Sequence, residues 1–447
     1  MLGRRIKILT LRLLSLSCWH HPIVFQTPSG HVVDNIVLRP LIDCINRINS
    51  SPYFSFCFGR RAGIMSGTGN YEQDSAAVHI WVRAETKPNE ARAPLIPQAC
   101  KDLLNAGIKV TVERSHQRIF LDEEYEKAGC ILVPNGTWKD APKNAFIVGI
   151  KELPNDSFPL VHRHIYFGHV YKNQEGWQEL LGRFKAGGGA LLDVEYMCFK
   201  DGRRAVAEFS QVAGAVGAAL GVELWTFKQL QNAEKFTVPF HYKSEEDFLV
   251  HLRSCLNKVA AGNEALKSRP KVMVMGALGR CGKGATSMLE KIGLKGEQII
   301  RWDLEETKKG GPFSEILDFD VFVNCIYLPP GGKPMPPFLH EEMLKSKDRN
   351  LTVVVDVSCD TSNPNSPLPF VKDITTFKEP VFTVNLGKGE KPLDVIAIDH
   401  LPSMLPREAS MKHSAKLALQ LADLVQIEKS VVWMSALNTF HEKVGLI

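Results

Sequence analysis

The sequence lacks the features that mark several large classes of protein. No uninterrupted apolar stretch reaches the roughly 18 to 20 residues of a membrane-spanning helix, so we predict no membrane span. Ten cysteines occur without C-x-x-C pairs or the Cys/His spacing of a zinc site, which argues against a disulfide framework and against a bound metal. The remaining composition is that of an ordinary globular protein, 44% hydrophobic and 23% charged, and 447 residues suggest two or three domains.

Acidic residues are scarce at the start of the chain. Residues 1–64 contain eight Lys and Arg against Asp34 and Asp43, a net charge of +6, which leaves the rest of the +5 chain near −1. A nearly neutral body gives no reason to predict a nucleic-acid surface. The Arg-rich, Ser-rich leader has the composition of a mitochondrial presequence. We favour the alternative that translation begins at Met65, and we treat residues 1–76 as a disordered or spurious basic extension.

From residue 78, strand-like runs alternate with amphipathic helical segments. VHIWVRAE (78–85) has the pattern of a strand, and PLIPQACKDLLNAG (94–107) that of a helix. A second unit of the same kind begins at Lys271, after a helix of small residues at roughly 205–220 that would let another element approach closely. The alternation predicts an α/β fold with largely parallel sheets, and irregular chain followed by helices from about residue 399.

The segment GALGRCGKG (276–284) follows an apolar run and precedes a helical pattern, as phosphate-binding turns do. A Walker A loop is excluded, because Ala277 stands in place of its first glycine and Gly284 in place of its hydroxyl residue.

A dinucleotide suits the same turn better. Gly276, Gly279 and Gly282 supply the glycines, although their spacing is G-x-x-G-x-x-G rather than G-x-G-x-x-G. Asp303 ends the next predicted strand, 21 residues after Gly282, where a carboxylate accepts hydrogen bonds from ribose and repels a 2′-phosphate. Arg301 weakens this preference only slightly, because strand alternation points it to the other face. We therefore predict NAD rather than NADP.

Charged residues follow the first predicted strand in RAETKPNEARAPLIP (83–97). Polar residues at the carboxyl end of a strand in an open α/β sheet lie where ligands bind. Arg92 can make a two-pronged contact with a carboxylate, so we predict substrate binding here. A solvated surface loop is the alternative.

A lysine and three histidines follow. Lys151 ends a predicted strand in GIKELP, and His162, His164 and His169 lie within eight residues of one another. A lysine with a lowered pKa and a histidine suit acid–base chemistry on an amine. The residues alone do not select one histidine, and they lack companions at zinc-site spacing.

Two further segments are polar. DVEYMCFKDGRR contains Glu195, Arg203 and Arg204, and adjacent arginines can hold substrate carboxylates or form a solvated turn. IDHLPSMLPREAS (398–410) is a polar loop between prolines at the junction of the two halves.

Taken together, these motifs resemble the fungal saccharopine dehydrogenases, an NAD-dependent, L-lysine-forming family related to alanine dehydrogenase and to transhydrogenase domain I. The resemblance covers residues 78–440 and rests on the ordered motifs RAETKPNEARAPLIP, GIKELP, FGHVYK, GRR, GALGRCGKGA, WDLEETKKGGPF, VNCIYL, VVDVSCDTSNPNSP and IDHLPSMLPREAS. It implies two Rossmann-like domains with parallel sheets separated by a cleft. Residues 77–205 plus 399–447 would form the substrate domain, and residues 206–398 the NAD-binding domain.

The resemblance also implies a reaction: saccharopine + NAD⁺ + water → L-lysine + 2-oxoglutarate + NADH, the last step of lysine biosynthesis through α-aminoadipate. A neutral lysine base and a histidine acid–base catalyst match Lys151 and His169. The substrate carboxylates and the charge balance of the site would be handled by Arg92, Lys172, Arg203, Arg204, Glu195, Lys87 and Glu90. The cofactor would contact Gly276, Gly279, Arg280, Gly282, Asp303, Cys325, Tyr327, Asp399 and Leu401.

The implied partners are the small molecules saccharopine, L-lysine and 2-oxoglutarate, without nucleic acid or membrane, and we expect a monomer. The C-terminal EKVGLI lacks an S-K-L-type peroxisomal address, so a cytoplasmic location is expected ahead of a peroxisomal or mitochondrial one. Two alternatives stay open: an alanine dehydrogenase-like enzyme, whose substrate has one carboxylate, and a non-catalytic NAD sensor.

Two cysteines carry a further hypothesis. Cys281 lies on the glycine turn and Cys325 ends the predicted strand DVFVNC. If the two strands are neighbours, a disulfide between these thiols would obstruct the pyrophosphate. Two free buried thiols are the alternative.

Overall fold

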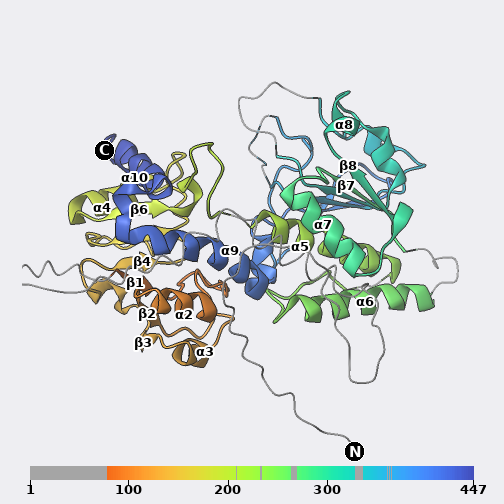
Figure 1. The fold of residues 1–447 in the computed structure, drawn as a ribbon. Helices are drawn as coiled ribbons and strands as arrows, with labels where there is room; N and C mark the ends of the chain where they lie inside the picture. The colour runs from red at the N-terminus through yellow and green to blue at the C-terminus, as the bar shows by residue number, and fades with distance from the viewer. Residues whose placement is uncertain are drawn as a thin grey trace, which may run out of the picture. The chain divides into compact units, whose positions relative to one another are not determined.

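The computed structural model describes residues 78–207, 209–231, 234–262, 269–327, 336–359, 361, 363 and 365–447. The predicted N-terminal extension therefore lies outside the described residues. Two six-stranded sheets, each accompanied by helices, make up the framework of the described part (Figure 1). The predicted α/β class is confirmed.

The first sheet is entirely parallel and has the order β3-β2-β1-β4-β5-β6. Its strands are β1 (His79–Val82), β2 (Lys109–Glu113), β3 (Ile131–Val133), β4 (Phe146–Val148), β5 (Arg163–Tyr166) and β6 (Ala190–Asp193). Every residue of the central strands β1 and β4 is buried, as expected for a parallel sheet covered on both faces. Because β1 pairs with β2 on one side and β4 on the other, the chain connections diverge at the carboxyl ends of β1 and β4. Open α/β sheets bind ligands at such a point.

Helices from both ends of the described chain pack against this sheet. They are α2 (Pro97–Asn105), α3 (Asp122–Lys127), α4 (Trp177–Gly187), α9 (Pro406–Leu421) and α10 (Val431–Val444). Gly188 ends α4 in the left-handed conformation, which glycine adopts without steric cost. Trp433 of α10 is fully buried in the same core as Ile80 of β1, so the C-terminal segment belongs to the first sheet's core.

The second sheet has the order β11-β12-β10-β9-β7-β8 and is parallel except for β11. Its strands are β7 (Val272–Met275), β8 (Ile299–Trp302), β9 (Val321–Asn324), β10 (Val353–Asp356), β11 (Phe382–Val384) and β12 (Leu393–Ile396). The α-helices of this half are α5 (Ser210–Gln229), α6 (Glu245–Gly262), α7 (Arg280–Lys291) and α8 (Leu304–Thr307). The 3₁₀ helices of the whole described chain are η1 (Thr137–Asp140), η2 (Val194–Tyr196), η4 (Gly296–Gln298), η5 (Ser314–Asp318), η6 (Met343–Lys345), η7 (Leu401–Met404) and η8 (Ala422–Lys429). Because β7 pairs with β8 on one side and with β9 on the other, the chain connections of this sheet diverge between β7 and β9.

Glycines allow α5 and α7 to touch backbone to backbone. A β-carbon at Gly214 of α5 would overlap the carbonyl oxygen of Cys281, and one at Gly284 of α7 would overlap that of Gln211. The close approach expected of the small-residue helix is therefore confirmed.

Several predicted boundaries were wrong. The small-residue helix extends over Ser210–Gln229 rather than 205–220, because its last turns are buried beneath tertiary contacts that single-residue propensity does not register. The strand β5 was missed, since its sequence RHIY contains two ionisable residues, although His164 is fully buried. The short strands β11 and β12 were also missed; they lie among polar, turn-rich sequence.

Helix α9 contributes to both hydrophobic cores. Ala409, near its start, packs with the second sheet's core, whereas Leu417 and Leu421 pack with the first. The domain boundary proposed at residue 399 stays a prediction. In the described residues, no helix is long and apolar enough to cross a membrane.

Candidate active site

The carboxyl ends of β1, β4, β5 and β6 bring the predicted catalytic residues together. The segment after β1 contains Arg92, the segment after β4 contains Lys151, and the segment after β5 contains His169. Glu195 follows β6 within η2. All four residues line one cavity of about 210 Å³, which we call the central cavity. Its lining is completed by Ile150, Phe167, Arg204, Phe209, Asp399, His400 and Pro402.

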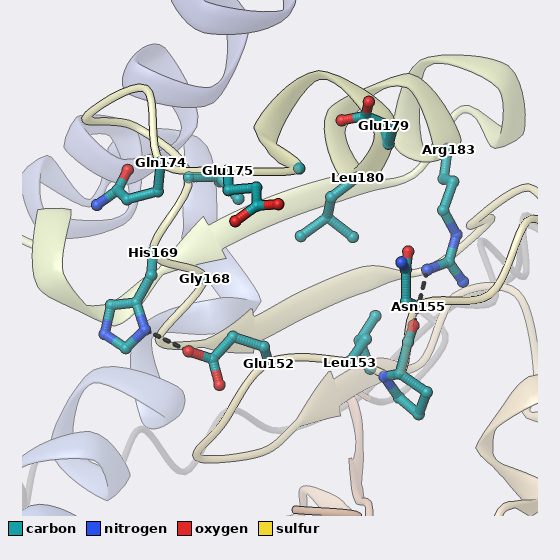
Figure 2. Close-up of a pocket in the computed structure, with 13 residues that line it drawn as sticks. Glu152, Leu153, Asn155, Gly168, His169, Gln174, Glu175, Glu179, Leu180 and Arg183 are labelled. Carbon is teal, nitrogen blue, oxygen red and sulfur yellow. Dashed lines mark hydrogen bonds and ion pairs between the residues drawn. The ribbon is translucent and has the colours of Figure 1, made fainter. Parts of the chain in front are cut away.

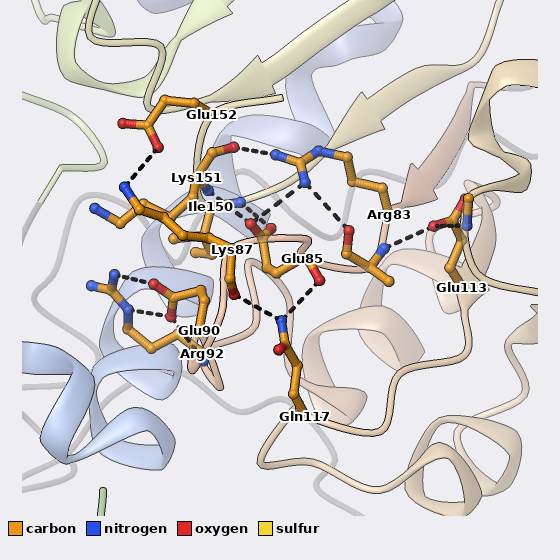
Figure 3. A network of polar contacts seen from close by, with 12 residues as sticks. Arg83, Glu85, Lys87, Glu90, Arg92, Glu113, Gln117, Ile150, Lys151 and Glu152 are labelled. Atoms are coloured by element: carbon orange, nitrogen blue, oxygen red, sulfur yellow. Dashed lines mark hydrogen bonds and ion pairs between the residues drawn. The ribbon is translucent and has the colours of Figure 1, made fainter. Parts of the chain in front are cut away.

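A buried ion pair fixes the backbone at Lys151. Arg83 Nη1 lies 3.4 Å from Glu85 Oε2, and Glu85 accepts hydrogen bonds from the backbone N–H groups of Ile150 (2.6 Å) and Lys151 (3.0 Å) (Figure 3). Arg83 also donates to the Lys151 carbonyl. A β-carbon at Gly149 would meet the Arg83 guanidinium at 2.5 Å, so glycine is required beside this pair. Because both partners are buried and mutually paired, they hold the strand end rigidly.

The environment of Lys151 favours its neutral form. Burial lowers the pKa of its ammonium group, and the nearby positive charge of Arg92 lowers it further. The side chain lines the central cavity and also a neighbouring cavity of about 160 Å³ that contains Lys87, Glu90 and His400. A lysine in this state can take up a proton from a substrate amine.

Arg92 is held by a carboxylate of its own loop. Its Nε donates to Glu90 Oε1 (2.7 Å) and its Nη2 to Glu90 Oε2 (2.6 Å). Burial opposes the ionised form, yet the pKa of Glu90 is lowered by Arg92. The guanidinium lies 4.8 Å from the ring centre of Phe209, which in turn stacks on the ring of His413 at 5.1 Å. Arg92 therefore faces the cavity with its direction fixed and part of its charge already neutralised.

His169 is oriented by a residue that sequence reasoning missed. Its Nδ1 lies 2.5 Å from Glu152 Oε1 (Figure 2), and Lys87 Nζ lies 3.5 Å from Glu152 Oε2 (Figure 3). Burial acts against ionisation of Glu152, but the hydrogen bond from His169, a backbone hydrogen bond and the nearby positive charge of Lys151 together outweigh it, and the pKa of Glu152 falls to about 2. The carboxylate thus accepts the Nδ1 proton and leaves Nε2 free for chemistry. In the sequence, the feature that could have pointed to Glu152 was its position next to Lys151.

The backbone at His169 is in an unusual conformation. Its φ is +52°, in the left-handed region that residues with a β-carbon seldom adopt. The preceding N–H, of Gly168, donates to Asp193 Oδ2 at the end of β6 (3.0 Å). Burial raises the pKa of Asp193 to about 6. Such backbone strain is typical of functional positions that the surrounding structure holds in place.

Two predicted cations meet at Glu195. Arg204 Nη2 and Lys172 Nζ lie 2.9 Å and 3.2 Å from its Oε1. Arg203 instead pairs with Asp201 and is not among the residues that line the central cavity. The roles predicted for these three cations stay predictions, and the geometry favours Arg204.

The structure separates the three histidines. His162 and His164 are buried in β5 and its preceding turn, where His162 Nε2 lies 3.0 Å from the Ala141 carbonyl and His164 packs edge-on against Trp138. Only His169 of the three lines the central cavity. His400, which belongs to the predicted polar loop 398–410, also lines it, and burial with the charge of Lys151 lowers its pKa.

The cofactor residues predicted from the sequence gather at the ends of β7, β8 and β9. Gly276 has φ +82°, and a β-carbon at Gly282 would overlap its carbonyl oxygen. Gly279 is the residue before α7 and offers no side-chain cap, and a helix start without such a cap suits an anion. Asp303 Oδ2 accepts from the Leu278 N–H (2.8 Å), which ties the end of β8 to the turn.

Exposed apolar side chains surround this turn. Leu278, Leu304 and Tyr327 are 67%, 72% and 57% exposed. An apolar ring system such as adenine would cover them. Glycine turn, uncapped helix start, carboxylate and apolar surface together fit a dinucleotide.

The remaining predicted cofactor contacts fall in different places. Asp399 lines the central cavity, whereas the Leu401 side chain is buried in the second sheet's core, so only its backbone is available to a ligand. Cys281 and Cys325 are free thiols, and the two side chains are hydrogen-bonded to each other, with burial adding to a raised pKa for Cys325. The strands that precede these two cysteines, β7 and β9, are neighbours, as the disulfide hypothesis required. Disulfide formation itself stays a hypothesis. Among the described residues, no group of His, Cys, Asp and Glu has the arrangement of a metal site.

The comparisons with known proteins first define a class. Residues 81–216 match the family model described as alanine dehydrogenase/PNT, N-terminal domain. A solved L-alanine dehydrogenase superposes with a TM-score of 0.56 at 16% identity, covering 81% of this chain and 94% of that one. At this identity the likeness shows the fold alone: a two-domain, Rossmann-like protein.

Curated relatives then define the family. A saccharopine dehydrogenase [NAD(+), L-lysine-forming] of Emericella nidulans is 48% identical over 372 residues, which are 82% of this chain and 98% of the relative. The enzyme of that name from Schizosaccharomyces pombe is 45% identical over 369 residues, 82% of this chain and 99% of the relative. The chain belongs to the NAD-dependent, L-lysine-forming saccharopine dehydrogenase family.

Proposed function

We propose that the protein catalyses the NAD⁺-dependent cleavage of saccharopine to L-lysine and 2-oxoglutarate. The observation that carries the proposal is the meeting of Lys151, His169 and the Glu152 carboxylate beside a cavity lined by two arginines, in a chain of this family. Saccharopine contains a secondary amine and three carboxylates, so its cleavage requires a base, a water-activating group and cations.

Lys151 is the base of the oxidation step. Its neutral Nζ takes the proton from the secondary amine of saccharopine as the carbon–nitrogen bond is oxidised to an imine. The lowered pKa of Lys151 makes this form available, because burial and Arg92 disfavour the ammonium.

His169 acts in the hydrolysis step. Its Nε2 takes a proton from the water that adds to the imine carbon and passes it to the nitrogen, which gives a carbinolamine. It then moves the hydroxyl proton to the same nitrogen as the carbon–nitrogen bond breaks, which releases the ketone of 2-oxoglutarate and the ε-amine of lysine. Glu152 supports both directions of transfer, since its carboxylate 2.5 Å from Nδ1 stabilises the imidazolium and fixes the tautomer of the neutral ring.

The cations hold the carboxylates of the glutaryl half. Arg204 and Arg92 face the central cavity, and each is restrained by a carboxylate, Glu195 or Glu90. These partners set the directions of the guanidinium groups and keep the cavity from carrying a large excess of positive charge near Lys151.

Bound NAD⁺ supplies the hydride acceptor. The turn at Gly276–Gly282 and the first N–H groups of α7 would hold the pyrophosphate, Asp303 the adenosine ribose, and Leu278, Leu304 and Tyr327 the adenine.

Product analysis tests the proposal. Purified protein would be incubated with saccharopine and NAD⁺, and lysine, 2-oxoglutarate and NADH would be quantified after quenching. Formation of the three in equal amounts is expected. NADH without free lysine, or no NADH from protein that binds the cofactor, would contradict it.

A cytoplasmic monomer is the state we propose on the sequence grounds given above. Sedimentation of the purified protein and fractionation of cells that express the full chain test the two statements separately.

A further inference from the structure

A second cavity of the described chain also has the proposed catalytic histidine, His169, in its lining. It has a volume of about 640 Å³ and is bounded by His169 and Glu152 at one end and by helix α4 at the other (Figure 2). We call it the acidic cavity, because Glu152, Glu175 and Glu179 line it against the single cation Arg183.

The two cavities that share His169 differ in charge. In the central cavity the cations Arg92 and Arg204, beside the neutral Lys151, balance Glu195 and Asp399. The acidic cavity has three carboxylates and one guanidinium. Its excess of negative charge suits L-lysine, which carries a net positive charge with two ammonium groups, and disfavours 2-oxoglutarate, which is a dianion.

Glu175 and Glu179 are available to a ligand. Within the described residues, neither carboxylate forms a hydrogen bond or ion pair, and both are exposed. Glu175 points toward the middle of the cavity in Figure 2. Their neighbours Glu152 and Lys172, by contrast, are both paired.

Arg183 adds an independent sign of an unfilled site. The residue is only 8% exposed; its Nε donates to the Phe158 carbonyl (3.0 Å) and its Nη1 to the Pro154 carbonyl (3.1 Å). Its Nη2 is buried and has no hydrogen-bond partner among the described residues. A buried guanidinium nitrogen without a partner is costly, and a carboxylate that reached it would satisfy it.

We propose that the acidic cavity binds the lysine half of the substrate, with Glu175 and Glu179 recognising the α-ammonium group and Arg183 the α-carboxylate. The proposal rests on the proposed function and deepens it. The glutaryl half occupies the central cavity, and His169 lies at the boundary where the bond between the two halves is made and broken. Charge therefore sorts the two co-substrates into their own cavities before they react.

Kinetics with a lysine analogue test the assignment. The variants are Glu175→Gln, Glu179→Gln and the double variant, with Glu123→Gln on α3 as the control, since Glu123 is also exposed and forms no hydrogen bond or ion pair within the described chain. The substrates are L-lysine and 6-aminohexanoate, which lacks the α-amino group, each with 2-oxoglutarate and NADH.

The double variant is expected to raise the KM for L-lysine by roughly fivefold, the effect of exposed charge pairs. Its kcat and its KM for 2-oxoglutarate should stay within about twofold of the wild type. Its kcat/KM for 6-aminohexanoate should not change, because that analogue has no α-ammonium to lose. Equal effects on both amines, or no effect on L-lysine, would overturn the proposal.

The outcome also separates this inference from the function itself. A wild-type protein inactive with L-lysine and 2-oxoglutarate would refute the proposed function. An active wild type whose Glu175 and Glu179 variants keep its KM for L-lysine would refute only the acidic-cavity assignment. Because both glutamates are exposed and unpaired, the variants are expected to fold.

Discussion

In each of the two sheets, the carboxyl ends of the strands form one edge, and these two edges carry different side chains. In each, the strand order reverses beside the first strand, between β1 and β4 in one sheet and between β7 and β9 in the other. The first edge is crowded with ionic side chains such as Glu85, Lys151 and Glu152, whereas the second begins with Gly276 and ends in exposed apolar groups such as Tyr327. Under the proposed function the same topology serves two ligand sites, and the residues at the strand ends decide which one does chemistry.

The contrast has a physical reason. A cofactor's pyrophosphate needs backbone N–H groups close at hand, so the second edge gains from having no side chains there. Proton transfer needs side chains with shifted pKa values, so the first edge gains from burying charges beside one another. We therefore expect substitutions at the first edge to impair catalysis without weakening cofactor binding. Substitutions at the second edge should weaken cofactor binding instead.

Lys151→Met at the first edge has the largest expected effect. Removal of the base should lower kcat for saccharopine oxidation by about 10²- to 10⁴-fold. The dissociation constant of NADH, measured by its fluorescence on binding, should stay unchanged. Lys101→Met on the exposed face of α2 is the control. A comparable loss of NADH binding in Lys151→Met would remove the contrast between the edges.

Gly282→Ala tests the second edge. The added β-carbon overlaps the Gly276 carbonyl, so the turn has to move, at a cost of about 1–3 kcal/mol that we expect to appear as lower thermal stability and at least tenfold weaker NADH binding. Gly262→Ala is the matched control, because a β-carbon there meets no atom within 4 Å. Calorimetry and NADH titration measure both effects; unchanged NADH affinity in Gly282→Ala would contradict the assignment.

Glu152→Gln sharpens the role of the residue beside Lys151. An amide still accepts from His169 but no longer stabilises an imidazolium, so kcat should fall by roughly tenfold with little change in NADH affinity. The pKa of Glu152 is lowered, so its ionised form contributes stability above about pH 4.5 that is lost as the pH falls toward about 2. Denaturant unfolding of both proteins across this range should show their difference shrinking in acid. A difference that stayed constant would refute the ionic account.

Asp303→Ser should have the smallest effect of the four. Loss of the ribose contact is expected to weaken NADH binding by about fivefold and to narrow the preference over NADPH, as removal of one hydrogen bond and one repulsive charge would. Arg301→Ser is the control, since Arg301 pairs with Glu290 instead. An unaltered ratio of the two affinities would show that Asp303 does not select the cofactor.

Much of this architecture could be predicted from the sequence, because strand-end motifs are local. Lys151 lies in GIKELP and Asp303 closes IIRWD, and both follow the carboxyl ends of strands, as the pattern implied. Partnerships between distant segments could not be predicted. The pair of Glu152 with His169 joins residues 17 apart, and the stack of Phe209 on His413 joins residues 204 apart.

Burial was the other unpredictable quantity. His162 and His164 look as functional as His169 in the sequence, and only tertiary packing distinguishes them, because it places the first two in the core. Arg203 and Arg204 are adjacent, yet one faces the cavity and the other pairs with Asp201. Side-chain direction in a turn depends on contacts that a single sequence does not contain.

The pH dependence of kcat/KM for saccharopine, measured on the wild type and on Lys151→Met, tests the central claim most directly. The base works in its neutral form and its pKa is lowered, so activity should rise with pH through a midpoint below the ordinary lysine value of 10.5. The same limb should be missing from the residual activity of Lys151→Met. A rising limb of the same midpoint in both proteins would show that another group is the base.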